Sequence, residues 1–446
     1  MKFFFSPFLL LSTLSLWAAY KAEISLDKVD GFYKCGEKAI CTVLVRRDGE
    51  PLAKEKLRLT VKKEGKIFLT QHFETDGSPV TISHTLDEPG WLYFGVEIIG
   101  NDDKPLKGKG IQIHSSKPTT VAEIGALFDA EKIKTTVTRP VDFEAFWQKK
   151  REDLDKVPLA PSLTPLPSGA HNVELYAVEI PCTGSRPATG YLAVPKNASP
   201  ESCPAVVEFR GWVYGDAHQD LAVAKAKRGV LSFYATWHGF PVGKPAEFYT
   251  KNIPDAIKKG ELDIHDRDTW VMGDIYLRVM RIMDFIKSRP EWDKKNLAAA
   301  GRSLGGAQAA VAAALDKDVT FAVVTVPCFS EFDTRESGRM PSIPHRTAAL
   351  IRQGDTQAYQ AGNYFDLVNL APLITCEVFV CTGFADEVCP ASNVFAFYNA
   401  LTCKKSMTTN PRTGHNSATQ NIKGNQRLEE LINSALLTNG RNHGNN

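Results

Sequence analysis

The chain lacks the features that would assign it to a specialised class of protein. It has no excess of one charge, because 53 lysines and arginines against 51 aspartates and glutamates leave a formal net charge of +2. Nothing therefore marks an electrostatic site for nucleic acid. It has no low-complexity or coiled-coil segment, and its 43% hydrophobic and 23% charged residues are typical of soluble domains. We expect 446 residues to form about two folded domains whose partner is a small or neutral molecule.

Long apolar runs are also absent, with one exception at the N-terminus. Lys2 precedes an apolar run over residues 3–17, and two alanines follow it. The run is shorter than the roughly 20 residues of a membrane-spanning helix, and its flanks are typical of an export signal. We expect residues 1–19 to be a signal peptide, the protein to be secreted or periplasmic, and no membrane span to remain after cleavage.

Cysteine is infrequent, with nine in the chain and no spacing typical of a metal site. The odd number leaves at least one thiol unpaired if the others form bridges. Cys35 and Cys41 lie close enough in an expected hairpin to be bridged in an oxidising compartment. The other seven are interpreted as small buried apolar side chains.

Residues 22–114 have the pattern of an all-β domain. Short strands separated by glycine-containing turns are expected at 39–45, 57–61, 80–84, 91–98 and 111–114. Their spacing predicts an immunoglobulin-like β-sandwich. It contains no catalytic constellation, so a spacer or docking role and a direct glycan-binding role both stay open. Residues 115–140 are expected to be a linker with one short helix around 121–129.

From residue 141 to 438 apolar strands alternate with helices. Helices are expected after Asp142, at 269–288, at 304–315 and near 426–437. Five continuous apolar runs predict strands buried on both faces: 205–209, 230–234, 297–300, 321–326 and 377–381. This alternation predicts an α/β fold with a parallel, doubly wound sheet, whose ligands lie beyond the carboxyl ends of the strands. Residues 439–446 are expected to be a disordered tail.

Residues 301–305, Gly-Arg-Ser-Leu-Gly, match the pattern G-x-S-x-G, which presents a serine on a sharp turn between a strand and a helix. The pattern alone is weak, but here an expected strand precedes it and an alanine-rich helix follows. A serine nucleophile needs a base and an acid, and on this kind of fold the chain order is Ser, Asp, His.

The position of the histidines limits the choice of base. Of ten histidines only His345, His415 and His443 follow Ser303. His443 lies in the expected tail, and His345 precedes the next expected strand, which leaves His415. Asp386 comes shortly after the strand at 377–381 and is the matching acid. We predict that Ser303 is the nucleophile, that His415 is the base and that Asp386 orients it.

The oxyanion that forms on attack needs two backbone donors. One is the N–H of Leu304, directly after the nucleophile. The second is assigned to Trp212, in the loop after an expected strand, with Gly211 as the close competitor. The indole of Trp212 borders the acyl pocket or fills a gap in the core. Trp237 and His238 are further candidate substrate contacts, with a structural hydrogen bond as the alternative for His238.

From about residue 140 to His415 the chain resembles the acetyl xylan esterase and cephalosporin C deacetylase family of α/β-hydrolases. The resemblance implies an α/β-hydrolase fold and removal of acetyl groups from sugar hydroxyls without a metal or other cofactor. The matching segments are 141–147 (VDFEAFW), 204–207 (PAVV) leading to Gly211-Trp212, 301–306 (GRSLGG), 386–395 (DEVCPASNVF), Tyr398-Asn399 and His415.

Two segments depart from the family pattern. Trp237-His238-Gly239 stands where such esterases usually carry Arg-Gly-Gln, and Asn416 stands where a glutamate usually follows the catalytic histidine. Neither departure touches the predicted triad. They indicate a divergent branch whose natural ester need not be acetylated xylan.

We therefore expect an exported serine esterase, with its α/β-hydrolase domain in residues 141–438, that acts on an acetylated carbohydrate. Two alternatives stay open. One is a peptidase or a hydrolase of larger acyl esters on the same fold, and the other is a glycan-binding protein whose hydrolase domain serves as a scaffold. Family members can assemble so that neighbours restrict the active-site entrance, and no residue here decides between a monomer and a homo-oligomer.

Overall fold

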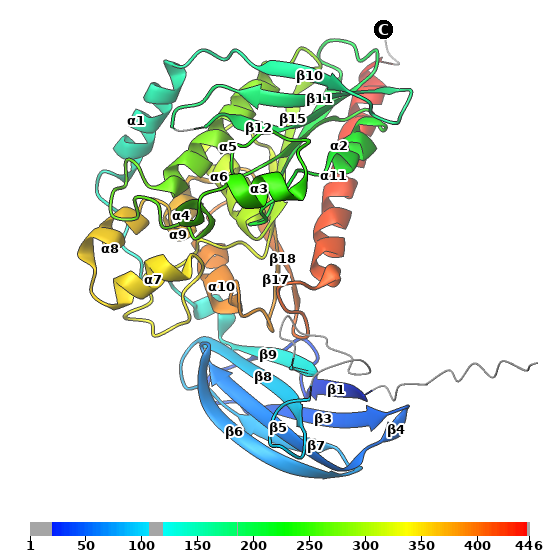
Figure 1. Ribbon diagram of the computed structural model, residues 1–446, viewed down its shortest axis with the longest axis vertical. Coiled ribbons are helices and arrows are strands. Elements are labelled where there is room, and N and C mark those ends of the chain that lie inside the picture. The colour runs from blue at the N-terminus through cyan, green and yellow to red at the C-terminus, as the bar shows by residue number, and fades with distance from the viewer. Residues whose placement is uncertain (1–19, 107–118, 185, 444–446) are drawn as a thin grey trace, which may run out of the picture.

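The computed structural model describes residues 20–106, 119–184 and 186–443. These residues form an N-terminal pair of β-sheets and a larger α/β domain stacked end to end (Figure 1). The expected signal peptide at 1–19 and the expected strand at 111–114 lie outside the described residues.

The two N-terminal sheets face one another across a shared apolar core. We call this pair of sheets the sandwich. Alternate side chains of its strands point inward, as in β3, where Ala39, Cys41, Val43 and Val45 are buried. Its assignment as immunoglobulin-like stays a prediction. One sheet contains β1 (Tyr20–Leu26), β3 (Ala39–Arg47), β4 (Glu50–Pro51) and β7 (Val80–His84), and the other has the order β2 (Phe32–Tyr33), β9 (Ala122–Phe128), β8 (Gly90–Ile99), β5 (Ala53–Lys63) and β6 (Lys66–Asp76).

Strand β9 lies where a linker with a short helix is expected, and this expectation is wrong. All seven of its residues are buried, and it pairs with β8 inside the second sheet. Ile124 and Ala126 pack in the core of the sandwich, while Leu127 packs with the core of the α/β domain. A short strand buried on both faces loses the alternation that identifies strands in a sequence, so its apolar run resembles a helix.

The α/β domain is built on a sheet whose described strands have the order β10–β11–β12–β14–β13–β15–β16–β17–β18. The pairs from β14 to β18 are parallel, and the first three pairs are antiparallel. The bounds are β10 (Ser162–Leu166), β11 (Val173–Ile180), β12 (Ala188–Pro195), β13 (Cys203–Phe209), β14 (Leu231–Ala235), β15 (Trp292–Arg302), β16 (Phe321–Thr325), β17 (Glu377–Gly383) and β18 (Lys405–Asn410).

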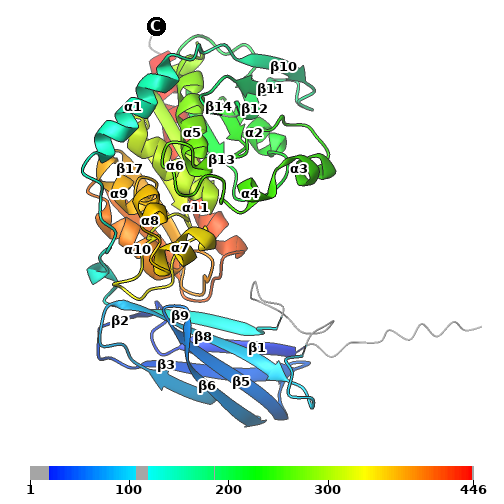
Figure 2. The ribbon, with the colours of Figure 1, turned by 60° about the vertical axis from the view of Figure 1, so that its left-hand side comes forward.

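Helices cover both faces of this sheet (Figures 1 and 2). Helices α5 and α6 pack with one face, and α2 and α11 pack with the other. The bounds are α1 (Phe143–Asp155), α2 (Gln219–Ala226), α3 (Ala246–Asn252), α4 (Asp255–Lys258), α5 (Val271–Lys287), α6 (Leu304–Leu315), α7 (His345–Arg352), α8 (Thr356–Gly362), α9 (Leu367–Leu370), α10 (Ala391–Ala400) and α11 (Ala418–His443), with short 3-10 helices at Ala130–Lys132 and Ala371–Leu373.

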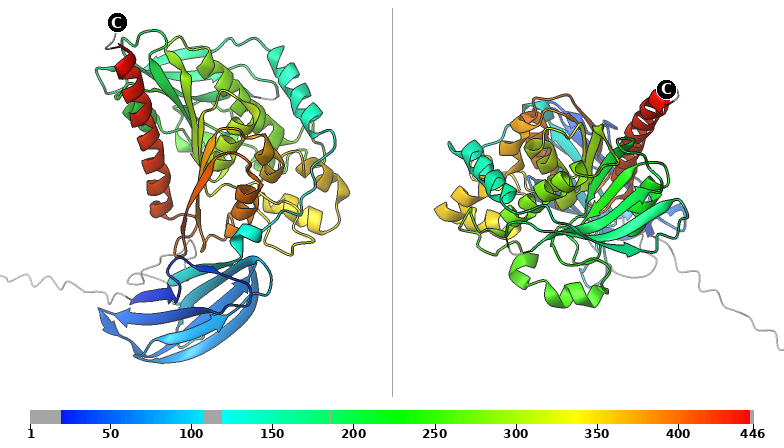
Figure 3. Two further views of the ribbon diagram at one scale, coloured as in Figure 1. Left: turned by 180° about the vertical axis from the view of Figure 1, so that it is seen from behind. Right: turned by 90° about the horizontal axis from the view of Figure 1, so that it is seen from above.

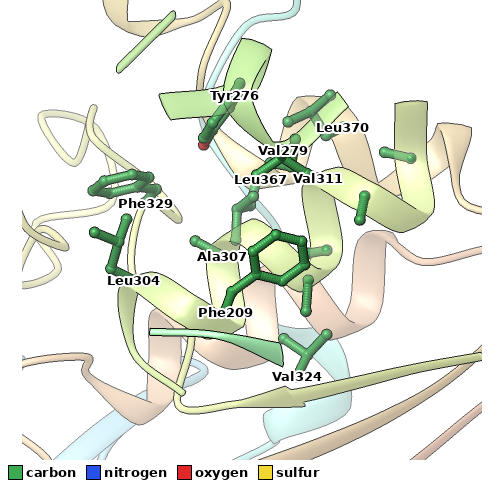
Figure 4. Close-up of a cluster of buried hydrophobic side chains, with 14 of the residues drawn as sticks. Phe209, Tyr276, Val279, Leu304, Ala307, Val311, Val324, Phe329, Leu367 and Leu370 are labelled. Carbon is green, nitrogen blue, oxygen red and sulfur yellow. The ribbon is translucent and has the colours of Figure 1, made fainter. Parts of the chain in front are cut away.

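The small side chains of α6 let this helix lie close to the sheet. Figure 4 shows Ala307 and Val311 of α6 among Val279 of α5 and the strand residues Phe209 and Val324. Close packing of this kind fixes the start of α6, and the predicted nucleophile directly precedes it.

The C-terminus differs from expectation. Helix α11 runs through His443, where a disordered tail is expected from residue 439. Its apolar positions Leu428 and Ile432 pack against the strand residues Val206 and Val323, which anchors the helix to the sheet. The anchored turns lie before residue 439, and the helix continues from them into the polar end of the chain.

Candidate active site

Ser303 lies on a strained turn between β15 and α6. Its backbone has φ 58° and ψ −120°, a conformation that non-glycine residues rarely adopt. Glycines on either side allow the strand and the helix to cross closely. A Cβ at Gly301 would overlap the carbonyl of Gly305, and a Cβ at Gly305 would overlap the carbonyl of Phe209. The local sequence thus forms the sharp turn that G-x-S-x-G predicts.

The structure brings the three predicted triad residues together. His415 Nε2 lies 3.1 Å from Ser303 Oγ, and His415 Nδ1 lies 2.8 Å from Asp386 Oδ2. All three are buried, with 6%, 8% and 0% of Ser303, His415 and Asp386 exposed. A continuous hydrogen-bonded path therefore runs from the hydroxyl through the imidazole to the carboxyl.

The second oxygen of Asp386 has its own partners. Oδ1 accepts hydrogen bonds from the N–H groups of Val388 at 2.8 Å and Cys389 at 2.9 Å. These two bonds hold the carboxyl plane so that Oδ2 faces His415. With Nδ1–H donating to Asp386, Nε2 is left as the acceptor that the Ser303 hydroxyl requires.

Two loops carry the acid and the base, and they are bonded to each other. We call residues 384–390, after β17, the acid loop and residues 411–417, after β18, the base loop. The N–H of Phe384 donates to Asn410 O at 3.0 Å, and the N–H of Ala385 donates to Thr413 O at 3.2 Å. These bonds continue the parallel pairing of β17 with β18 and set the separation of Asp386 from His415.

The predicted oxyanion donors also lie beside Ser303. Leu304 is the first residue of α6, where backbone N–H groups point out of the helix. A Cβ at Gly211 would lie 3.9 Å from Ser303 Cβ, so the loop after β13 passes next to the nucleophile. A hydrogen bond of 2.7 Å from Val213 N–H to Gly211 O forms a tight turn centred on Trp212. The assignment of the second oxyanion donor to the N–H of Trp212, with the N–H of Gly211 as the competitor, stays a prediction.

The ring of Trp212 forms part of an aromatic wall near Ser303. Its centroid lies 5.3 Å from Trp237 and 5.9 Å from Phe329, and its Nε1 donates to Lys258 O at 2.9 Å. Phe329 is fully buried and lies beside Leu304 (Figure 4). Sequence reasoning missed Phe329, and its position shortly after a buried strand is the signal that could have indicated it.

The structure contradicts the prediction that Trp237 and His238 contact a substrate. Both are completely buried, and Trp237 Nε1 donates to Val213 O at 3.0 Å. The N–H of Phe240 donates to His238 Nδ1, so Nε2 carries the proton and donates to Gly215 O at 3.0 Å. Burial lowers the pKa of His238 to about 4. These side chains support the loop of Trp212 instead of contacting a substrate, because the chain itself uses their hydrogen bonds.

The cysteines do not form bridges in the structure. Cys35 and Cys41 are both free, which corrects the bridge considered from their spacing. Burial raises the pKa of the Cys41 thiol to about 12. In the described ranges, no group of three His, Cys, Asp or Glu side chains is arranged to hold a metal ion.

Comparison with known proteins identifies relatives. Residues 126–429 match the acetyl xylan esterase (AXE1) family model. Acetyl esterase Axe7A of Xylanibacter ruminicola is 27% identical over 401 residues, covering 87% of this chain and 85% of that protein. The structure of the acetyl xylan esterase from Paenibacillus sp. R4 superposes with a TM-score of 0.59 at 23% identity, covering 68% of this chain and 98% of the other. Acetyl xylan esterase 1 from Thermoanaerobacterium sp. JW/SL YS485 gives 0.56 at 22% identity, covering 68% and 97%. The matches confirm the resemblance and the α/β-hydrolase fold expected from the sequence.

Proposed function

The chain belongs to the acetyl xylan esterase family of α/β-hydrolases, and we propose that it removes O-acetyl groups from carbohydrates through a Ser303–His415–Asp386 triad. As a family member it is an acetyl-esterase-like carboxylic ester hydrolase. The single observation that supports the triad is the hydrogen-bonded path from Ser303 Oγ through both nitrogens of His415 to Asp386 Oδ2.

The proposed reaction has two halves. Ser303 Oγ attacks the ester carbonyl while His415 Nε2 accepts its proton, and the oxyanion accepts hydrogen bonds from Leu304 N–H and from Trp212 or Gly211 N–H. When the intermediate collapses, His415 donates that proton to the departing sugar oxygen, and an acetyl group remains on Ser303. His415 then deprotonates a water molecule whose oxygen attacks the acetyl carbonyl, and the proton passes from His415 to Ser303 Oγ as the bond to the acetyl group breaks and acetate leaves.

The surroundings of the nucleophile favour an apolar acyl group. Phe329 lies beside Leu304, directly after Ser303, and Trp212 packs on Phe329 with the two ring centroids 5.9 Å apart. An aromatic wall beside the nucleophile suits the methyl group of an acetyl ester. It supports an acetyl ester over the peptidase alternative, and the chain-length series below decides between acetyl and larger acyl groups.

The decisive experiment measures acetate release from acetylated xylan, acetylated monosaccharides and p-nitrophenyl acetate, with p-nitrophenyl butyrate and octanoate as longer esters. Wild type should release acetate from at least one acetylated sugar, and kcat/KM should fall steeply beyond acetyl. Ser303→Ala should reduce kcat by several orders of magnitude. Activity on octanoate but not acetate would favour the larger-acyl alternative, and glycan binding without any turnover would favour the scaffold alternative.

Export is a second part of the proposal. The apolar run over residues 3–17 with its charged start supports a signal peptide. Among the helices in the described ranges, none has the length and hydropathy needed to cross a bilayer. Cell fractionation with and without residues 2–19 tests the proposal, because the full chain should leave the cytoplasm and the truncated chain should stay there.

A further inference from the structure

The sandwich lies against the carboxyl ends of the strands of the α/β domain, where the acid loop and the base loop emerge. Figure 3, seen from behind, shows β17 and β18 reaching down to it. Hydrogen bonds join the sandwich directly to both loops. The indole Nε1 of Trp91 in β8 donates to Phe384 O at 2.5 Å, and the N–H of Gly125 in β9 donates to Pro411 O at 2.8 Å.

Both acceptors are close to the triad in sequence. Phe384 lies two residues before Asp386, and Pro411 lies four residues before His415. Because the two contacts fall on different loops, the sandwich constrains the acid and the base at the same time. Trp91 is completely buried, and its hydrogen bond is shielded from water, which strengthens its orienting effect.

We call the region where β8 and β9 of the sandwich meet the acid loop and the base loop the joint. The strands of the sandwich have two distinct faces there. In β8, Leu92, Phe94 and Val96 point into the core of the sandwich, whereas Trp91 and Tyr93 pack with the core of the α/β domain. In β9, Gly125 lies directly opposite Tyr93, so it also faces the loops. The joint is thus built from every second residue of each strand.

Gly125 is in contact with the acid loop. A Cβ at this position would overlap the carbonyl of Phe384, the same group that accepts from Trp91. The φ of Gly125 is not in the left-handed region, so the reason for glycine here is the close approach of the loop.

A second layer of polar contacts holds the joint in place. Glu64 Oε1 accepts from the N–H of Trp91 at 2.6 Å, and its Oε2 accepts from the hydroxyl of Ser392 in α10 at 2.7 Å. Lys62 forms an ion pair with Glu387, the residue after Asp386. Strand β5 of the sandwich therefore contacts the segment that follows the acid, while β8 contacts the segment that precedes it.

We propose that Trp91 and Gly125 are positioning residues for the Asp386–His415 pair, so that the sandwich is a part of the catalytic unit and not a spacer. The proposal rests on the proposed function, because it assigns Asp386 and His415 the roles of acid and base. A displacement of about 1 Å between reacting groups can cost about 100-fold in rate, so the contacts that set the two loops matter for catalysis even though they touch no substrate.

Two substitutions test the proposal in the full-length protein. Gly125→Ala inserts a methyl group between β9 and the acid loop, and Trp91→Phe removes the indole donor while keeping an aromatic ring. With p-nitrophenyl acetate, kcat should fall about 100-fold for Gly125→Ala and about tenfold for Trp91→Phe, with KM changed less than about twofold. Val96→Ala, on the same strand but pointing into the core of the sandwich, is the matched control and should keep kcat.

Two readouts separate positioning from general loss of structure. The first is the downfield proton NMR signal of the His415–Asp386 hydrogen bond, assigned by its loss in His415→Ala. The second is the rate at which diethyl p-nitrophenyl phosphate modifies Ser303, measured per mole of folded protein. Both should change in Trp91→Phe and Gly125→Ala and stay as in wild type in Val96→Ala.

The outcomes are distinguishable. If both variants keep the NMR signal and a modification rate within twofold of wild type, the proposal is overturned while the triad stands. If wild type hydrolyses no acetyl ester, the proposed function fails, but the NMR signal and the modification rate still decide whether the sandwich positions the pair. If Gly125→Ala does not fold, Trp91→Phe alone decides.

Discussion

His415 and Asp386 meet through a single carboxyl oxygen, with 2.8 Å between Nδ1 and Oδ2, while the other oxygen accepts two backbone N–H groups of its own loop. The two oxygens of Asp386 thus have separate tasks. One holds the imidazole, and the other holds the carboxyl. Residues 386–389 therefore set the orientation of the Asp386 carboxyl through their own backbone hydrogen bonds. The position of the acid loop then sets the distance from Asp386 to His415.

Asp386→Asn should reduce kcat by about 10³ to 10⁴-fold with little change in folding. An amide can keep the hydrogen bonds of Oδ1, but an amide N–H facing His415 favours the tautomer that cannot accept from Ser303. The measurement is kcat on p-nitrophenyl acetate together with the circular dichroism spectrum. Asp355→Asn, which alters a carboxylate at the start of α8, is the control and should leave kcat unchanged. A loss smaller than tenfold in Asp386→Asn would contradict the assigned role.

Gly305→Ala should destabilise the protein by about 1–3 kcal/mol or more, because its Cβ would overlap the carbonyl of Phe209 at the crossing of strand and helix. Activity should fall with it, since Ser303 lies on the same turn. Gly362→Ala is a matched control: it lies at the end of α8, where an added Cβ meets its nearest neighbours at ordinary contact distances of 3.7 to 3.9 Å. Urea unfolding of both variants checks the prediction, and equal stabilities would refute the close crossing.

Glu64 should make the free energy of unfolding of the protein depend on pH. Burial raises the pKa of Glu64 to about 7, against the opposing effects of the hydrogen bond from Ser392 and the charge of Arg339, while Glu331 adds to the rise. The folded protein therefore holds this proton to higher pH than the unfolded chain, where the pKa is about 4.5. The contribution of Glu64 to stability is full below pH 4.5 and decreases as the pH rises to about 7.

The test compares wild type with Glu64→Gln, which cannot ionise but keeps an oxygen for the N–H of Trp91. The free energy of unfolding of wild type, relative to the variant, should fall between pH 5 and 7 by up to about 1.4 kcal/mol per pH unit and then become constant. Val96→Ala should lower stability by the same amount at each pH. A difference between wild type and Glu64→Gln that does not change with pH would contradict the buried, protonated state.

We predict that no disulfide bond contributes to the stability of the protein. All nine are free in the structure, and Cys41, Cys203, Cys328, Cys381 and Cys389 are buried. We expect a reducing agent to shift the thermal midpoint by less than about 1 °C, and native buried thiols to react slowly with a thiol reagent because burial disfavours the thiolate. Thiol titration after denaturation without reductant should give nine. A lower titre would show a bridge between cysteines.

Features that depend on local pattern could be predicted from the sequence alone. Continuous apolar runs and the alanine-rich segment predicted strands and helices that the structure has at these positions, with α6 at its expected bounds Leu304–Leu315 and with β15 and α11 extending further than expected. The G-x-S-x-G turn and the chain order of Ser303, Asp386 and His415 pointed to residues that the fold brings together. This succeeded because a doubly wound sheet places the carboxyl ends of its strands at one edge, so position after a strand implies proximity.

The remaining features depend on contacts between segments that are distant in sequence. Residues 122–128 form a strand and not a linker helix, because both faces of the strand are buried. One face packs in the core of the sandwich, and the other contacts the α/β domain at Phe384, about 260 residues further along the chain. Trp237 and His238 support a loop because neighbours from other segments use their hydrogen bonds. The contacts of Trp91 and Gly125 with the acid and base loops arise from the docking of one domain on another. Periodicity records which side of an element is apolar, but it does not record which distant surface covers that side.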